Sequence, residues 1–210
     1  LREQVAKALI GKGIALGQQD RFEEEVAAYG QVVDRFGDDP APGLREQVAK
    51  ALIGKGIALG QLGRYDDAAA SYGQILHTEP TNANALANHA QIDFARGRAD
   101  EGATKVQEVL QLAPKEPGLE PLLAECNFYL FAHVPAARLR AGIILKRMLS
   151  GGVSTGNWSY RPNLRQLRDS RSPRVELLDA LAEALAAGDP AGLAGFKEWQ
   201  DLPLRGVDGQ

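Results

Sequence analysis

Apolar residues recur every three or four positions along most of this chain, which is the period of an amphipathic α-helix. One such stripe comprises Leu44, Val48, Leu52, Gly56 and Leu59. Another comprises Phe22, Val26, Tyr29, Val33 and Phe36. The sequence shows no sustained alternation of apolar and polar residues with the turn dipeptides of β-hairpins. The pattern therefore predicts an all-α chain.

The helical pattern repeats. Residues 1–18, LREQVAKALIGKGIALGQ, recur letter for letter at residues 44–61, an offset of 43. A further unit follows 34 residues later, where Gly97 corresponds to Gly63. Repeated units of this length stack so that each buries the apolar face of its neighbour. We therefore expect a repeat array rather than one globular core.

Each unit predicts two helices joined by a short turn. Gly63 and Gly97 stand where a helix ends, and Pro80 and Pro114 follow the second helices. Acidic residues occupy the first turns of the second helices, where the helix dipole favours them: Glu23 to Glu25, Asp66, Asp67, Asp100 and Glu101. The interval of 43 residues between the first two units is nine residues longer than the interval of 34 that follows. These nine residues predict about two more turns on a first helix.

These residues resemble the tetratricopeptide repeat family over residues 2–116. The resemblance rests on the small, large and proline positions of its 34-residue pattern, namely Gly56, Leu59, Gly63, Arg64, Tyr65, Ala68, Tyr72, Pro80, Leu86, Ala90, Gly97 and Pro114. It implies a right-handed α-solenoid of three helical hairpins, at about 2–36, 43–79 and 82–114. The near-identical copies indicate recent duplication, for which we expect a longer parent array of bacterial type. Lys12, Lys55, Glu25 and Gly102 depart from the pattern.

Helical periodicity continues after Pro117 without the repeat signature. Segments 119–130 and 134–148 predict a divergent hairpin, followed by helices at 162–168, 173–187 and 190–199. A stack needs an end cap to shield its last apolar face. We therefore expect residues 117–200 to form a hairpin and a helical C-terminal cap, and residues 201–210 to form a tail.

The family resemblance implies an inner surface, formed by the first helices, that captures a peptide or a partner's helix. The matching stripe comprises Lys7, Ile10, Ile14, Gln18, Lys50, Ile53, Ile57, Gln61, Asn84, Asn88, Gln91 and Phe94. Because it mixes aliphatic side chains with amides, a groove for an amphipathic segment suits it better than a clamp for a carboxylate. The alternative, that Ile53 and Ile57 only pack against adjacent helices, stays open. The expected function is a non-catalytic protein–protein interaction scaffold.

The net charge of −3 hides a basic segment. Residues 134–174 hold nine lysines and arginines and one acid, Asp169. Within it Arg161, Arg165 and Arg168 share a helical face that follows Trp158 and Tyr160, and arginines beside aromatics can hold phosphate and stack on unpaired bases. Binding of RNA or single-stranded DNA by this candidate anion-binding face is an alternative function. The competing interpretation is a solvated face, or one that compensates the acidic repeats.

Candidate chemistry is sparse. The single cysteine, Cys126, excludes an intrachain disulfide and a zinc site built on paired thiolates. His77, His89 and His133 lack metal-ligand spacing. The stretch SGGVSTGN at 150–157 lacks the Gly-Lys-Ser/Thr ending of a phosphate-binding loop. We therefore expect no catalytic residues, no metal and no cofactor.

No stretch approaches the roughly 20 apolar residues of a membrane span, and no secretory leader is present. These features predict a cytoplasmic protein with a protein or peptide partner and no membrane partner. The chain begins at Leu1, inside the repeated unit, so we expect a missing N-terminal part. A regulatory repeat domain of a larger protein is thus a second alternative function.

Overall fold

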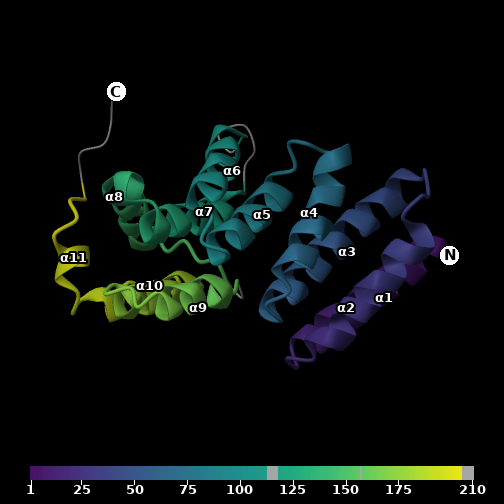
Figure 1. Cartoon of the computed structure of the whole chain (residues 1–210), viewed down its shortest axis with the longest axis horizontal. Helices are drawn as coiled ribbons and strands as arrows, with labels where there is room; N and C mark the ends of the chain where they lie inside the picture. Colours follow the sequence, from purple (N-terminus) through teal and green to yellow (C-terminus); the bar gives the residue numbers. More distant parts are fainter. Residues whose placement is uncertain (113–117, 157, 205–210) are drawn as a thin grey trace. The chain divides into compact units, whose positions relative to one another are not determined.

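In the computed structural model, residues 1–112, 118–156 and 158–204 are described, and every regular element among them is helical (Figure 1). The elements are α1 (Arg2–Gly17), α2 (Phe22–Phe36), α3 (Pro42–Gln61), α4 (Tyr65–Thr78), α5 (Ala83–Ala95), α6 (Ala99–Leu112), α7 (Glu120–His133), a 3₁₀ turn (Pro135–Ala137), α8 (Arg138–Ser150), α9 (Arg161–Asp169), α10 (Val175–Ala187), a second 3₁₀ turn (Ala191–Leu193) and α11 (Lys197–Gln200). The predicted all-α fold is confirmed.

The chain divides into two compact units, an N-terminal unit (Leu1–Ile92) and a C-terminal unit (Asp93–Gln210). The division falls inside α5. Pro114, Pro117 and the predicted boundary between residues 116 and 117 lie outside the described residues, as do Asn157 and residues 205–210. The predicted domain limits therefore remain predictions.

In the N-terminal unit the aromatic ring of Tyr29 joins three helices. A Cβ added at Gly13 of α1 would lie 2.6 Å from Tyr29 Cε1, and one added at Gly54 of α3 would lie 2.5 Å from Tyr29 Cζ. The ring thus lies against bare backbone on both sides, and Tyr29 is only 4% exposed. Tyr72 of α4 packs in the same way on Gly56 of α3. Gly56 therefore allows α3 and α4 to approach each other closely.

The turns between paired helices follow one plan. Gly63 and Gly97 both have φ of 75°, in the left-handed region that glycine adopts without strain. Asp20 takes the same place after α1 with φ of 56°. In the first two turns, the next residue returns a backbone hydrogen bond to the preceding helix, Arg21 N to Leu16 O and Arg64 N to Leu59 O. The predicted glycine stops are thus confirmed.

Helix lengths also agree with the sequence. The first helix of the second hairpin, α3, has 20 residues, whereas α5 has 13. Seven residues make about two turns of α-helix. The extra length in the longer interval therefore extends α3, as predicted.

The C-terminal unit is built on α7, in which ten of the fourteen residues are buried. Phe94 stacks on His133 at 5.0 Å between ring centroids, and Phe128 lies 4.2 Å from Tyr160. The predicted helices at 162–168 and 173–187 correspond to α9 and α10. The predicted closing helix at 190–199 is instead a 3₁₀ turn and the short α11, in a stretch interrupted by Gly192 and Gly195.

The last described residues of the chain are held on α8. Lys146 Nζ donates hydrogen bonds to three carbonyl oxygens, at 3.1 Å to Trp199, 3.0 Å to Gln200 and 2.6 Å to Leu202. Trp199 is buried and packs edge-on against Phe131. This segment therefore covers part of the α7–α8 hairpin.

The two copies of the 18-residue sequence allow a matched test of the tyrosine packing. Gly54→Ala should lower the free energy of unfolding by about 1–3 kcal/mol, because its Cβ would overlap the buried Tyr29 ring. At the equivalent position, the Cβ of Gly11→Ala would have no atom within 4 Å. This substitution should therefore raise the free energy of unfolding by about 0.5–1 kcal/mol. Urea denaturation followed by circular dichroism measures both. Equal effects of the two substitutions would contradict the packing.

Candidate functional site

The predicted binding stripe is accessible on α1 and α3, and its lysines are ion-paired. Lys7 Nζ lies 2.6 Å from Glu3 Oε1, and Lys50 Nζ lies 2.6 Å from Glu46 Oε1. The hydrogen bond to Glu3 raises the pKa of Lys7, and Glu46 on the adjacent helix adds to this rise. Each lysine therefore has an acidic neighbour, which leaves little net positive charge for a partner's carboxylate.

The aliphatic part of the stripe is partly exposed. Ile14 is 50% exposed, and Ile10, Ile53 and Ile57 are half-buried. Ile53 packs against the core cluster of Leu52, Ile75 and Ala85, so part of its side chain belongs to the core. Gln18 is exposed and Gln61 is half-buried.

The part of the stripe on α5 is mostly buried. Asn84 is exposed, whereas Asn88 is 2%, Gln91 4% and Phe94 0% exposed. Asn88 Nδ2 donates a 2.7 Å hydrogen bond to Asn84 O, one turn back on the same helix. Phe94 belongs to the aromatic core of the C-terminal unit. These three side chains are therefore closed to a partner in the free chain.

Each unit contains a hollow whose floor is a first helix between two second helices. In the N-terminal unit α3 lies between α2 and α4, and the hollow measures about 810 Å³. It contains Lys50, Ile53 and Asn84 of the predicted stripe. Its other lining residues include several charged side chains: Asp34, Asp38, Arg45, Glu46 and Glu79.

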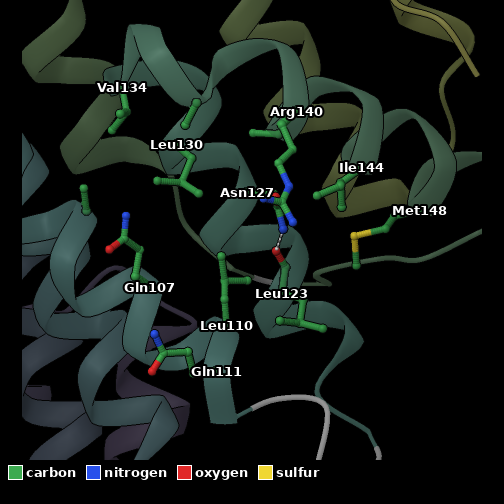
Figure 2. Close-up of a pocket in the computed structure, with 13 residues that line it drawn as sticks. Gln107, Leu110, Gln111, Leu123, Asn127, Leu130, Val134, Arg140, Ile144 and Met148 are labelled. Carbon is green, nitrogen blue, oxygen red and sulfur yellow. Dashed lines mark hydrogen bonds between the residues drawn. The ribbon is translucent and has the colours of Figure 1, made fainter. Parts of the chain in front are cut away.

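The hollow of the C-terminal unit is apolar. It measures about 760 Å³, and α7 lies between α6 and α8; we call it the α6–α8 groove. Figure 2 shows aliphatic and thioether side chains surrounding it, namely Leu110, Leu123, Leu130, Val134, Ile144 and Met148. Its polar lining consists of Gln107, Gln111, Asn127 and Arg140. Sequence reasoning did not find this groove.

One polar side chain of the groove is hydrogen-bonded within the protein, and another is accessible to a binding partner. Asn127 Nδ2 donates a 2.7 Å hydrogen bond to Leu123 O, drawn as a dashed line in Figure 2. Arg140 is exposed, and no hydrogen bond or ion pair joins it to another described residue. The groove thus combines an apolar floor with one cation that can meet an acidic partner group.

The candidate anion-binding face is partly used within the protein. Arg161, Arg165 and Arg168 are exposed, but Arg168 is paired with Asp179 at 2.6 Å. Trp158 donates a 2.7 Å hydrogen bond from Nε1 to Tyr129 Oη. Tyr160 is only 4% exposed and packs on Phe128. The aromatic rings that were predicted to stack on bases are therefore committed to internal contacts.

Other residues of the basic segment have structural partners. Arg174 pairs with Glu198, with Nη2 and Oε1 2.6 Å apart, and its guanidinium lies 4.4 Å from the centre of the Phe131 ring. The glycine-rich stretch is a connector, because Ser154 Oγ donates to Ala186 O and Thr155 N donates to Leu185 O. These bonds attach it to the end of α10.

Buried titratable groups on α7 do not form a recognisable reactive site. Burial raises the pKa of Glu125 to about 8 and lowers that of His133 to about 4. Burial also raises the pKa of the Cys126 thiol, so its thiolate is suppressed. Among the described residues, no group of three or more His, Cys, Asp and Glu side chains could hold a metal ion.

The structure so far defines an all-α repeat protein made of stacked helical hairpins. Residues 53–117 match the family described as Tetratricopeptide repeat, which supports the family resemblance over this part of the chain. Neither curated proteins nor solved structures provide a match to the chain. Tetratricopeptide repeats generally mediate protein–protein interaction and typically act as non-enzymatic scaffolds.

Within the described ranges, no single helix has both the length and the apolar character needed to cross a membrane. The pair Glu120–His133 and Pro135–Ser150 reaches that length and composition together, but it is bent by 119°.

The buried carboxyl of Glu125 should make the stability of the protein depend on pH. Its folded pKa of about 8 exceeds the ordinary 4.5, so the folded state binds the proton more tightly and stability falls as pH rises between these values. Glu125→Gln removes this loss. The free energy of unfolding of the variant, relative to that of the natural chain, should therefore increase by roughly 1–4 kcal/mol as the pH rises from 5 to 8.5.

Urea denaturation at a series of pH values measures the difference between the two chains. Because both chains share all other titrating groups, including His133, the difference isolates Glu125. A difference that stays constant with pH would show that Glu125 does not retain its proton in the fold.

Proposed function

We propose that this protein binds an amphipathic helix of a partner protein in the α6–α8 groove. The apolar lining of this groove is the observation that carries the proposal. Helical partners use apolar residues at positions i, i+3, i+4 and i+7 to fill such grooves. A volume of about 760 Å³ is within the range of sites that enclose several side chains.

The lining also suggests the chemistry of the partner. Leu, Ile and Met side chains favour aliphatic or aromatic anchors, and Met148 can adapt to different shapes. The exposed Arg140, which no ion pair joins to another described residue, favours an acidic residue at the edge of the partner's apolar face. The proposed ligand is therefore an acidic amphipathic helix.

The predicted stripe on α1 and α3 remains a second part of the proposed binding surface. Its accessible members are Lys7, Ile10, Ile14, Gln18, Lys50, Ile53, Ile57, Gln61 and Asn84. Because its lysines are paired with Glu3 and Glu46, it suits a mixed polar and aliphatic peptide better than a free carboxylate. Nucleic-acid binding and a regulatory role in a larger protein gain no specific support from these contacts.

A selection with matched variants tests the groove. A displayed library of helix-forming peptides about four turns long is selected on the whole chain, and the recovered peptides are titrated by fluorescence anisotropy. Ile144→Glu should weaken binding about ten-fold or more, because it places a carboxylate on the apolar side of the groove that α8 forms. Leu139→Glu on the same helix is the control, since Leu139 is 62% exposed and does not line the groove.

Arg140→Glu tests the groove independently of Ile144→Glu, because it changes an exposed residue without disturbing the core. It should weaken binding of the acidic peptides and strengthen that of lysine-substituted versions. Circular dichroism confirms that each variant keeps its helical content. Peptides that bind Ile144→Glu and Leu139→Glu equally well would rule the groove out as the binding site.

A further inference from the structure

Helix α8 has the α6–α8 groove on one side and a later segment of the chain on the other. Ile144 and Met148 of α8 line the groove. Lys146 Nζ donates hydrogen bonds to three carbonyl oxygens within residues 199–202. Because two residues turn an α-helix by about 200°, Lys146 and Ile144 lie on opposite sides of α8. The side of α8 that faces away from the groove is therefore bound by the chain itself.

We call residues 196–204 the strap; α11 forms its first part (Figure 1). Two of its side chains are buried, Trp199 at 4% and Leu202 at 8% exposure. Trp199 packs edge-on against Phe131 of α7. On α8, a Cβ added at Gly142 would lie 2.8 Å from Leu202 Cδ1. The strap therefore contacts both helices of the α7–α8 hairpin.

Two arginines bind the strap from outside it. Arg174 Nη1 donates a 2.9 Å hydrogen bond to Phe131 O, and its Nη2 lies 2.6 Å from Glu198 Oε1. Arg147 Nε of α8 donates a 3.1 Å hydrogen bond to Leu204 O. Glu198 is 40% exposed, so water competes for its ion pair and the pair adds little stability.

Most of the strap lies on the surface. Phe196 is half-buried, and its other residues apart from Trp199 and Leu202 are exposed. The preceding Ala194 and Gly195 are exposed as well, whereas Leu193 is 0% exposed. Segments with few buried contacts open at a lower free energy than the rest of a fold. The strap can therefore leave α8 while Leu193 stays in the core.

We propose that the strap is a latch that keeps α8 in position, and that its release weakens the binding of a partner helix in the α6–α8 groove. The regulatory part of this proposal rests on the proposed function. With the strap docked, α8 is already ordered as one wall of the groove. With the strap released, part of the binding free energy must order α8, and the affinity falls. By thermodynamic linkage, a bound partner favours the docked strap to the same degree.

Hydrogen exchange of the whole chain, followed by mass spectrometry, tests the latch without any ligand. The release variant carries Trp199→Ala and Leu202→Ala, and Lys197→Ala is the matched control at an exposed position of the strap. Amides of α8 should exchange about ten-fold faster or more in the release variant than in the control. Amides of α10 should exchange at the same rate in both chains.

The peptides selected on the groove test the regulation. Fluorescence anisotropy should show about five-fold weaker binding or more to the release variant, and natural affinity for Lys197→Ala. Circular dichroism checks that the release variant keeps its helical content. If it does not, Glu198→Arg is the milder variant, because it breaks only the ion pair with Arg174 and should change exchange and affinity in the same directions.

Rescue by a separate peptide distinguishes a latch from a general loss of stability. A synthetic peptide with the sequence of residues 194–204, AGFKEWQDLPL, is added in excess to the release variant. It should restore slow exchange of α8 and the affinity of the groove. The same peptide with alanine in place of its tryptophan and of the leucine three residues later is the control, and it should restore neither.

Three results would overturn the proposal: equal α8 exchange in the release variant and in Lys197→Ala, acceleration that extends equally to α10, and faster α8 exchange with unchanged groove affinity. The proposed function fails separately, when the selected peptides bind Ile144→Glu and Leu139→Glu equally well. The exchange measurement uses no peptide, so it decides whether the strap keeps α8 in position in that case too.

Discussion

The packing of a tyrosine ring against bare glycine backbone determines how the N-terminal unit assembles. Tyr29 lies between Gly13 of its own hairpin and Gly54 of the next, so one side chain fixes both the pairing of α1 with α2 and the stacking of α3 on them. Tyr72 repeats half of this arrangement on Gly56. Helix-interior glycine costs about 1 kcal/mol in propensity, and here the close contact with a large buried ring offsets that cost.

Several lysines and arginines are held by acidic groups or backbone carbonyls within the protein, and this shapes what the surface can recognise. Lys7 and Lys50 are paired along their own helices, whereas Lys146 and Arg174 hold residues 198–202 within the C-terminal unit. Much of the basic segment at 134–174 therefore has a structural role. The α6–α8 groove, with Arg140 in its lining, differs from these ion-paired surfaces because its lining is mostly apolar.

Local periodicity was enough to predict the helices, the extra turns of α3 and the glycine stops at Gly63 and Gly97, because each depends on residues within a few positions. The α6–α8 groove could not be predicted in this way. It forms where half-buried residues of three helices meet, and a sequence does not show which half-buried side chains remain uncovered. The partners of Arg174 and Lys146 were equally hidden, since they lie 24 or more residues away along the chain.

The duplicated sequence shows the limit of local reasoning most directly. Gln4 and Gln47 have identical neighbours along the chain, yet one is exposed and the other 4% exposed. A face built from Gln, Ala and Gly tolerates both states, because it has little apolar surface to expose to water and no large side chain to obstruct an incoming helix. Such a face lets the same sequence stay exposed in one copy and be buried in the other. Position in the array, rather than the sequence of the unit, then decides which residues are core and which are surface.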